Sequence, residues 1–378
     1  MFTNRASFLT IVCSHVLGTA IVAAVLAGGC PDAAVPPADI ELKFDVGPAA
    51  ADVEPKEPPV FQRGVIFDSL EGIVGSHGPT VTVFEDGELF AAWYSYRDYR
   101  ELIGAAIYAS RLRPGSTTWE TPWVLVDRPQ ADGNPVLYSE GDAVWLFQAV
   151  VPGTGWSTAH IEVQRSFDRG QTWSEPRRIV APLGTNVRCP PVRLADGALL
   201  LPAYSDLIQR STYYVSEDGE EWTWRSTVST PFPFMNLQPS VTTLASGRVL
   251  AVMRNSGLGW LWVTASDDGG QSWAAPQASG FPNPGSPIAL ARLHSGNLVL
   301  VFNDDNMLRS PLSIALSRDE GVTWYPPRVL ADGGGDLAYP TVVQSPDGLV
   351  QIVYSNARDN IGHITLNEAW ILVGEAGG

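Results

Sequence analysis

A small set of basic, phenolic and imidazole side chains along the chain could together bind an anion and act on the atoms beside it. An arginine guanidinium is a planar fork that holds a carboxylate or sulfate through two parallel hydrogen bonds. Tyrosine and histidine can attack carbon or move a proton next to such an anion. The set consists of His77, Arg188, Arg254, Arg309, Tyr339 and Arg358, with Asp98 and Glu101 as candidate proton donors. Any single arginine could instead be solvated or paired with Asp304, Asp305 or Asp359.

Four copies of a short turn sequence must help to position these residues. They begin at Ser166, Ser216, Ser266 and Ser317, and each continues through Asp and Gly to Trp, while residues 110 to 119 form a weaker fifth copy. The serines lie about fifty residues apart, a period typical of repeat architectures. Asp and Ser accept hydrogen bonds from turn N–H groups, Gly supplies a positive φ, and Trp covers the turn. We therefore interpret the aspartates as turn caps rather than as metal ligands or acid–base catalysts.

Two further repeats count the units. Six glycine turns separate strand-like apolar runs, at Asp86-Gly87, Glu140-Gly141, Asp196-Gly197, Ser246-Gly247, Ser295-Gly296 and Asp347-Gly348. A residue followed by Pro opens the run before each turn, where proline costs no ladder hydrogen bond. Six units of four antiparallel strands predict an all-β fold, a six-bladed β-propeller over residues 61 to 378. We call its Ser–Asp–Gly–Trp turns the Asp-box turns. Residues 65 to 67 and 363 to 366 are expected to share a blade and close the ring.

Blade geometry also predicts where the candidate residues meet. If the glycine turns and the Asp-box turns lie on one face, the other face collects the starts of the first strands and the loops after the second strands. The arginines, His77 and Tyr339 then surround one axial mouth, with Asp98 and Glu101 at its rim.

Composition narrows the partners. The net charge of −16 argues against nucleic acid and anionic membrane surfaces, and it means that an anionic ligand needs a local basic cluster. No metal-ligand spacing stands out among the five histidines, so we expect no metal and no cofactor.

Cys189 is alone in the propeller and is interpreted as a small packed residue. We expect a monomer.

The N-terminal segment has the pattern of an export signal. Arg5 precedes an apolar run over residues 8 to 29, and the residues before Cys30 resemble a bacterial lipobox, which predicts lipidation of Cys30. The alternative is an uncleaved membrane anchor, since about 20 apolar residues can span a bilayer. Residues 31 to 60 are rich in Pro, Ala and acidic residues and are expected to be a disordered linker. The predicted location is therefore outside the cytoplasm, as a cell-envelope lipoprotein or a secreted protein.

With its Asp-box repeats, the chain resembles the sialidase (neuraminidase) superfamily over roughly residues 65 to 370. It is most similar to the BNR-repeat, predicted-neuraminidase branch, through Asn283-Pro-Gly-Ser286, Arg309-Ser-Pro-Leu312 and Ala338-Tyr-Pro340. The resemblance implies three arginines on a substrate carboxylate, a tyrosine nucleophile activated by a glutamate, and an aspartate acid–base. By position, Tyr339 matches the nucleophile, and Arg254 and Arg309 match the second and third arginines.

Three positions depart from that pattern. The first arginine is replaced by His77, and the activating glutamate falls at Gln238. An amide cannot take the proton of a phenol with a pKa near 10. The acid–base aspartate has no clear match, which leaves Asp98 and Glu101 as candidates in the corresponding loop.

Three functions remain open on these residues. The first is a sialidase-like exo-glycoside hydrolase acting on acidic sugars of extracellular glycans. In it, Tyr339 is the nucleophile or proton carrier, His77 and Gln238 orient the substrate, and the acidic sugar is bound by Arg254, Arg309, Arg188, Arg358 and Asn283. The second is a lyase or rhamnosidase-type enzyme on uronate glycans, centred on His77 as a base near neutral pH. The third is a non-catalytic glycan-binding lipoprotein, in which His77 is a structural histidine at the start of a strand.

Overall fold

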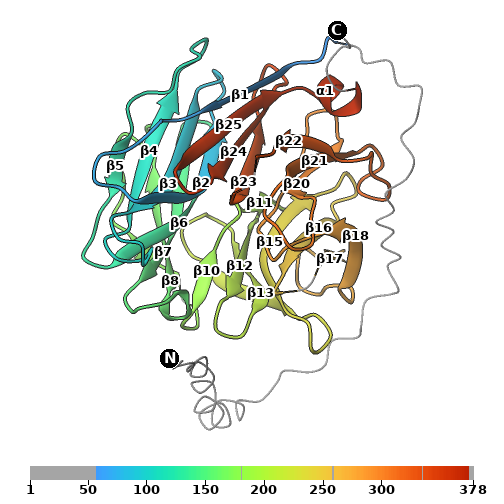
Figure 1. Ribbon diagram of the computed structural model, residues 1–378. Helices are drawn as coiled ribbons and strands as arrows, with labels where there is room; N and C mark the ends of the chain where they lie inside the picture. The colour runs from blue at the N-terminus through green and yellow to red at the C-terminus, as the bar shows by residue number, and fades with distance from the viewer. Residues whose placement is uncertain (1–56, 180, 258, 334, 374–378) are drawn as a thin grey trace, which may run out of the picture. The chain divides into compact units, whose positions relative to one another are not determined.

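Six sheets of antiparallel strands follow one another along the chain. The computed structural model describes residues 57–179, 181–257, 259–333 and 335–373, and in these residues the six sheets form a six-bladed β-propeller (Figure 1). The first strands of neighbouring blades contact one another, as β2 (Gly75–Val83) does with β6 (Ala131–Glu140) and β23 (Leu337–Gln344). The predicted fold class is confirmed.

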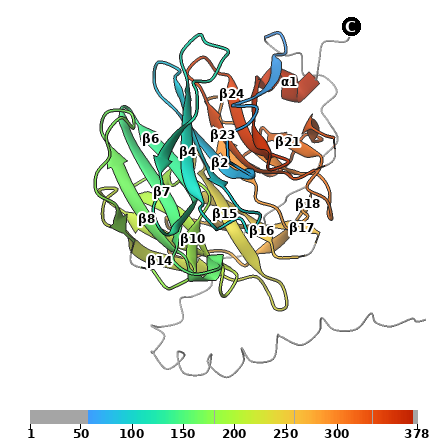
Figure 2. The same cartoon turned by 60° about the vertical axis from the view of Figure 1, so that its left-hand side comes forward.

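The remaining strands extend each blade outwards, as the turned view in Figure 2 shows for the second and fourth blades. Blades one and two are completed by β3 (Leu89–Tyr96), β4 (Ala106–Leu112), β5 (Trp123–Val126), β7 (Ala143–Val151), β8 (His160–Ser166) and β9 (Arg177–Arg178). Blades three and four contain β10 (Thr185–Val187), β11 (Val192–Arg193), β12 (Leu199–Ser205), β13 (Arg210–Ser216), β14 (Thr223–Val228), β15 (Asn236–Thr243), β16 (Val249–Asn255), β17 (Trp260–Ser266) and β18 (Gln277–Pro282). Blades five and six contain β19 (Ala289–Arg292), β20 (Leu298–Asn303), β21 (Leu312–Ser317), β22 (Arg328–Ala331), β24 (Val350–Asn356), β25 (Asn360–Leu366) and β1 (Phe61–Val65).

The ring closes through the N-terminal strand. β1 pairs antiparallel with β25, with Phe61 opposite Leu366 and Val65 opposite Gly362. The strand therefore lies a few residues earlier than the predicted residues 65 to 67. Asn367 holds the same segment from the other side, because its side chain binds the carbonyl of Pro58 and the N–H of Val60. The last residues of the predicted linker are thus attached to the propeller.

The predicted turns occur where two strands of a blade meet. The turn glycines have φ near +90° in five blades and +56° in the second, which only glycine adopts without strain. In the Asp-box turn after β8, the Ser166 hydroxyl accepts from the N–H of Gly170 at 2.7 Å, and the Asp168 carboxylate accepts from the N–H and hydroxyl of Thr172. The copies at Asp218, Asp268 and Asp319 accept turn N–H groups in the same way. The aspartates are turn caps.

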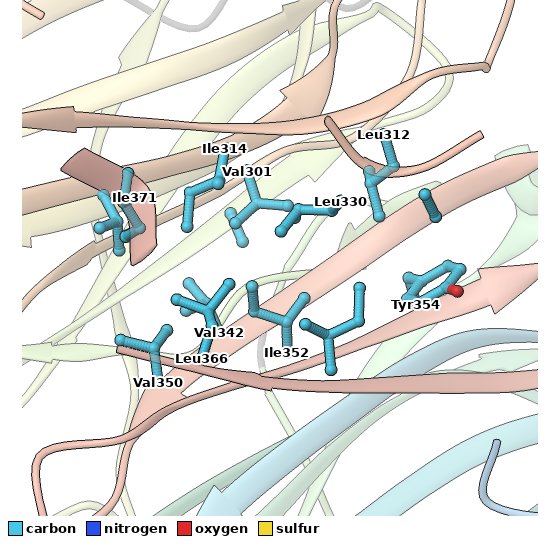
Figure 3. Packing of buried hydrophobic residues seen from close by; sticks show 14 of the residues in the cluster. Val301, Leu312, Ile314, Leu330, Val342, Val350, Ile352, Tyr354, Leu366 and Ile371 are labelled. Atoms are coloured by element: carbon cyan, nitrogen blue, oxygen red, sulfur yellow. The ribbon is translucent and has the colours of Figure 1, made fainter. Parts of the chain in front are cut away.

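Apolar side chains fill the seams between blades. Figure 3 shows the seam between the fifth and sixth blades, where Val301 and Ile314 face Val342 and Ile352. The short helix α1 (Glu368–Val373) adds Ile371 to this cluster. Alternating strand residues point to opposite faces of a blade, so each blade supplies one apolar face to each neighbour. This packing fixes the blades and therefore the loops that they carry.

The export signal over residues 1 to 30, the lipid site at Cys30 and most of the linker lie outside the described residues. Within residues 57–373, apart from the three undescribed positions, no helix is both long and apolar enough to cross a membrane.

Candidate active site

Bulges in the first strands set the geometry at the axis of the ring. β2, β6, β15 and β23 each shift register directly before a proline. At the bulge, Asn134, Gln238 and Tyr339 have φ of +43°, +47° and +57°, a left-handed conformation that costs a non-glycine residue about 1–3 kcal/mol. β-bulges re-aim a side chain and are frequent beside active sites. The strain therefore marks these three side chains as functional candidates.

The first blade has Gly78 at the equivalent place. Gly78 has φ of +60°, and a Cβ built on it would lie 2.7 Å from the ring of Tyr94. Tyr94, near the end of β3, therefore occupies the space that a side chain fills in the other bulged blades. His77 is the residue just before this glycine, and its ring contacts that of Tyr94 edge-on at 5.8 Å between centroids.

Arg188 crosses the axis of the propeller. It lies between β10 and β11 of the third blade, and its Nη2 donates to the carbonyls of Tyr339 at 2.6 Å and Pro340 at 3.1 Å in the sixth blade. Its guanidinium carbon lies 5.2 Å from the centroid of the Tyr339 ring. The side chain is 1% exposed, and burial lowers its pKa. Arg188 is thus committed to the main chain beneath Tyr339.

His77 is packed against the same tyrosine. The two ring centroids are 4.1 Å apart, and His77 is fully buried. Burial lowers the pKa of His77 well below its usual value, and the charges of Arg358, Arg309, Arg188 and Arg254 lower it further. Neither ring nitrogen has a hydrogen-bond partner among the described residues. His77 is therefore a neutral imidazole at pH 7 with no partner on either nitrogen, and its pKa lies below the near-neutral value that the sequence predicted for a base here.

Gln238 links Arg254 to a second buried tyrosine. Arg254 Nη1 donates to Gln238 Oε1 at 2.8 Å, and Gln238 Nε2 donates to the hydroxyl of Tyr204 at 3.2 Å. Asn134 Nδ2 donates to that hydroxyl at 3.3 Å, and burial raises the pKa of Tyr204. Arg254 remains half-buried and has no carboxylate partner among the described residues, so its charge is available to an anionic ligand.

Two other candidate arginines are joined by one carboxylate. Asp336 accepts from Arg309 Nη1 at 3.3 Å and from Arg358 Nε at 2.8 Å. Arg358 Nη1 also donates to Glu101 Oε2 at 2.9 Å, and Tyr94 donates to Glu101 Oε1 at 2.5 Å. The ion-pair partners are therefore Asp336 and Glu101, and not the aspartates at 304, 305 and 359 that the sequence suggested. The guanidinium carbon of Arg309 lies 5.7 Å from the centroid of the Tyr339 ring.

Two predicted site residues, Asp98 and Asn283, form no hydrogen bond to the arginine, histidine and tyrosine side chains of this cluster among the described residues. Asp98 is bound by Arg100 Nε at 2.8 Å, and this hydrogen bond holds the pKa of the carboxyl below its usual value. Asn283 is buried, and its Oδ1 accepts from the N–H groups of Gly285 and Ser286. It thereby shapes the loop whose Gly285 carbonyl accepts from Arg309 Nη2 at 3.1 Å.

Three residues of the cluster were not singled out from the sequence. Tyr94 and Tyr204 lie near the ends of the second strands of blades one and three, on the face predicted for the mouth, so strand position was the available signal. Asp336 follows a glycine-rich stretch and has no sequence signal. Its role depends on its contacts with two arginines from different loops.

The cluster offers cationic and phenolic groups and no metal site. Among the described residues, no group of three or more His, Cys, Asp or Glu side chains could hold a metal ion. A pocket of about 340 Å³ lies away from the axial cluster, on the face of the glycine turns, and is lined by Trp119, Gln351 and His363. His363 is held there by the indole N–H of Trp119 and by Gln351, so its ring nitrogens are both satisfied.

Comparison with known proteins agrees with the fold. The sequence matches the family described as BNR repeat-like domain over residues 87–352. No curated protein matches the chain. Similar solved structures include a protein of unknown function from Dyadobacter fermentans, at 20% identity and a TM-score of 0.69 over 81% of this chain and 99% of that one. The Hadza microbial sialidase Hz136 has the same identity and TM-score, over 79% of this chain and 66% of its own.

An intramolecular trans-sialidase from Ruminococcus gnavus is 13% identical, with a TM-score of 0.67 over 82% of this chain and 97% of its own. At these identities the likeness establishes the architecture, which is that of a sialidase-like six-bladed propeller. The chain belongs to the BNR repeat-like family.

Proposed function

We propose that the protein is a sialidase-like exo-glycoside hydrolase acting on an acidic sugar. The observation that carries the proposal is the presence of two arginines beside the ring of Tyr339. This half-buried phenol has Arg188 beneath it and the guanidinium of Arg309 within 6 Å of its ring. In a protein with a net charge of −16, this local positive charge favours an anionic substrate held beside a nucleophilic side chain.

Arg254 and Arg309 bind the sugar carboxylate in this proposal, because both are half-buried and retain hydrogen-bond donors for it. The hydrogen bond of Arg254 is to an amide, and the ion pair of Arg309 with Asp336 is long, at 3.3 Å. Arg358 is bound by two carboxylates and Arg188 by two carbonyls, so they support the site rather than grip the substrate. His77 and Gln238 position the sugar ring.

Tyr339 Oη then forms a bond to the anomeric carbon as the glycosidic C–O bond breaks. The phenolic proton passes to neutral His77, since the amide of Gln238 cannot accept it. The departing oxygen takes a proton from the carboxylic acid form of Glu101, which contacts the cluster through Tyr94. Glu101 is preferred to Asp98 because Asp98 is bound by Arg100. Water then forms a bond to the anomeric carbon as the bond to Tyr339 Oη breaks. One water proton passes to the Glu101 carboxylate, and His77 returns its proton to Tyr339 Oη.

The direct test is turnover of a fluorogenic sialoside by the full chain, beside Tyr339→Phe and a Tyr213→Phe control. Tyr213 is a buried tyrosine of β13 that packs on Trp273 and lies outside the cluster. Turnover that disappears only in Tyr339→Phe supports the proposal. Absence of turnover in the parent chain rules out this substrate class and leaves either uronate chemistry or glycan binding without catalysis.

His77 supports a second candidate, a lyase or rhamnosidase-type enzyme on uronate glycans. A neutral histidine with two unpartnered nitrogens can remove the proton next to a carboxylate, while an arginine stabilises the charge that develops. A rise in ultraviolet absorbance from unsaturated uronate products, lost in His77→Gln, identifies the lyase. Release of rhamnose without such a rise identifies the hydrolase.

We further propose that the chain is exported and anchored as a monomer through a lipid on Cys30. The support is the sequence pattern that precedes Cys30. Mass spectrometry of the mature N-terminus tests it, with Cys30→Ser as control. A free, unmodified N-terminus in the mature protein contradicts the anchor, and a dimer in light scattering contradicts the monomer.

A further inference from the structure

Large exposed apolar side chains gather on the loops around the axial mouth. In the described residues, the loops that follow second strands and precede first strands carry ten of them: Val74, Tyr99, Ile103, Leu183, Leu207, Ile208, Phe232, Met235, Met307 and Leu308. Phe232 is 95% exposed, Tyr99 89% and Met307 82%. Single exposed apolar residues are ordinary on a protein surface, but a gathering on one face marks an interaction site.

Hydrogen bonds between loops make most of this set one continuous arc over blades three to five. The N–H of Asp206 donates to the carbonyl of Gly184 at 2.8 Å, which brings Leu183 beside Leu207. The N–H of Asn236 donates to the carbonyl of Gln209 at 3.3 Å, which brings the loop of Met235 beside that of Ile208.

The arc continues to the fifth blade. The N–H of Ser256 donates to the carbonyl of Met235 at 3.1 Å. A Cβ on Gly259 of the same loop would lie 3.5 Å from the Cβ of Asn306, the residue before Met307. We call the apolar side chains on these connected loops the apolar rim: Leu183, Leu207, Ile208, Phe232, Met235, Met307 and Leu308.

The apolar rim is continuous with the charged site. Leu308 is followed directly by Arg309, whose guanidinium lies near Tyr339. Leu207 lies on the loop that follows β12, three residues after Tyr204, and Tyr204 binds Gln238 in the cluster. A ligand whose anionic end is held by the arginines would therefore bring its other end to the apolar rim.

We propose that the natural substrate is an acidic glycolipid, whose sugar enters the mouth while its lipid portion contacts the apolar rim. The proposal rests on the hydrolase function above and narrows its substrate class. Charge complementarity supports this occupant, since the arginine cluster suits an acidic head group and the side chains beside it suit an apolar tail. The rim consists of separate loop tips, which can enter a lipid surface one by one.

The first measurement compares two substrates with the same acidic sugar, one a glycolipid in phosphatidylcholine vesicles and the other its soluble oligosaccharide. The rim variant Leu207→Ser/Phe232→Ser removes two apolar tips, and Phe167→Ser/Trp224→Ser removes two side chains that are 68% and 60% exposed elsewhere on the propeller. We expect the rim variant to lose about tenfold or more in kcat/KM on the glycolipid, since withdrawing two large apolar side chains from water stabilises the bound state. The control variant and the soluble substrate should change less than about twofold.

A second measurement does not depend on turnover. Co-sedimentation of the full chain with vesicles that contain or lack the acidic glycolipid is compared between parent, rim variant and control variant. Glycolipid-dependent binding that falls only in the rim variant supports the inference, even if no bond is cleaved. Equal binding in all three chains, or equal loss on both substrates, overturns it while leaving the hydrolase function intact. A rim variant that changes the oligomeric state instead shows that a second copy covers the rim.

Discussion

Arg188 and Tyr339 join opposite blades of the propeller across its axis, through a hydrogen bond of 2.6 Å from the guanidinium to the tyrosine carbonyl. The same guanidinium lies 5.2 Å from the tyrosine ring. The contact holds the strained backbone of Tyr339, at φ of +57°, and places a positive charge under its ring. Tyr339, the residue proposed to act as the nucleophile, is thus supported by the buried Arg188 from the opposite blade of the propeller.

Replacement of Arg188 by Ala should therefore destabilise the fold and disorder the site together. The change leaves the carbonyls of Tyr339 and Pro340 buried without these donors, at a cost of about 1–3 kcal/mol each, less what water recovers. We expect a loss of about 2–3 kcal/mol in the free energy of unfolding, measured with denaturant. Arg193→Ala removes an exposed arginine of the same blade, in β11, and serves as the control. Equal stability of the two variants would contradict the structural role of Arg188.

Replacement of Arg254 by Gln should weaken binding of an acidic ligand with little effect on stability. Arg254 is half-buried and makes one described hydrogen bond, to Gln238. A charge-assisted contact to a carboxylate is worth about 1.5–3 kcal/mol, so the dissociation constant should rise at least about tenfold by calorimetry. Arg248→Gln, at an exposed ion pair with Asp267, is the matched control. An unchanged affinity would place the carboxylate elsewhere.

Stability should fall as pH decreases below about 6.5. Burial lowers the pKa of His363 to about 4, and burial and the neighbouring arginines lower that of His77 well below its usual value. In the unfolded chain both histidines titrate near 6.5, so between that pH and the folded pKa the unfolded state binds more protons. Each then contributes up to about 1.4 kcal/mol of lost stability per pH unit.

The His363→Gln variant isolates one of these histidines. We expect its free energy of unfolding to depend less steeply on pH between about 6.5 and 4 than that of the parent chain, with the exposed His294→Gln as control. Parallel curves for parent and His363→Gln would show that His363 does not change its proton affinity on folding.

The Asp-box aspartates should matter for stability and not for turnover. Asp268 accepts hydrogen bonds from the N–H and hydroxyl of Ser272 and from the hydroxyl of Ser266. Asp268→Ala should cost about 1–2 kcal/mol, by analogy with the loss of a helix cap, while activity per folded molecule stays constant. Glu217→Ala, at an exposed position in another Asp-box turn, is the control. A loss of activity without a loss of stability would give Asp268 a chemical role.

The blades and their turns could be predicted from the sequence because the forces that specify them are local. Gly87 and Gly348 stand where a turn needs a positive φ, and Ser166 and Asp168 bond to N–H groups within a few residues. The face that carries the candidate site was predicted from antiparallel pairing. The exact closing strand did not, because the pairing of Phe61 with Leu366 joins the two ends of the ring.

The sequence by itself determined the architecture of this protein and the chemical types gathered at its axis. The tertiary structure alone decided which arginines are free, since Asp336 bridges Arg309 and Arg358 from a loop with no sequence signal. It also decided that Arg188 lies under Tyr339 and that His77 stays neutral, because burial and summed charge depend on residues far apart in the chain. Local hydrogen bonds and periodic apolar residues are encoded segment by segment, whereas electrostatic environments exist only once the blades have closed.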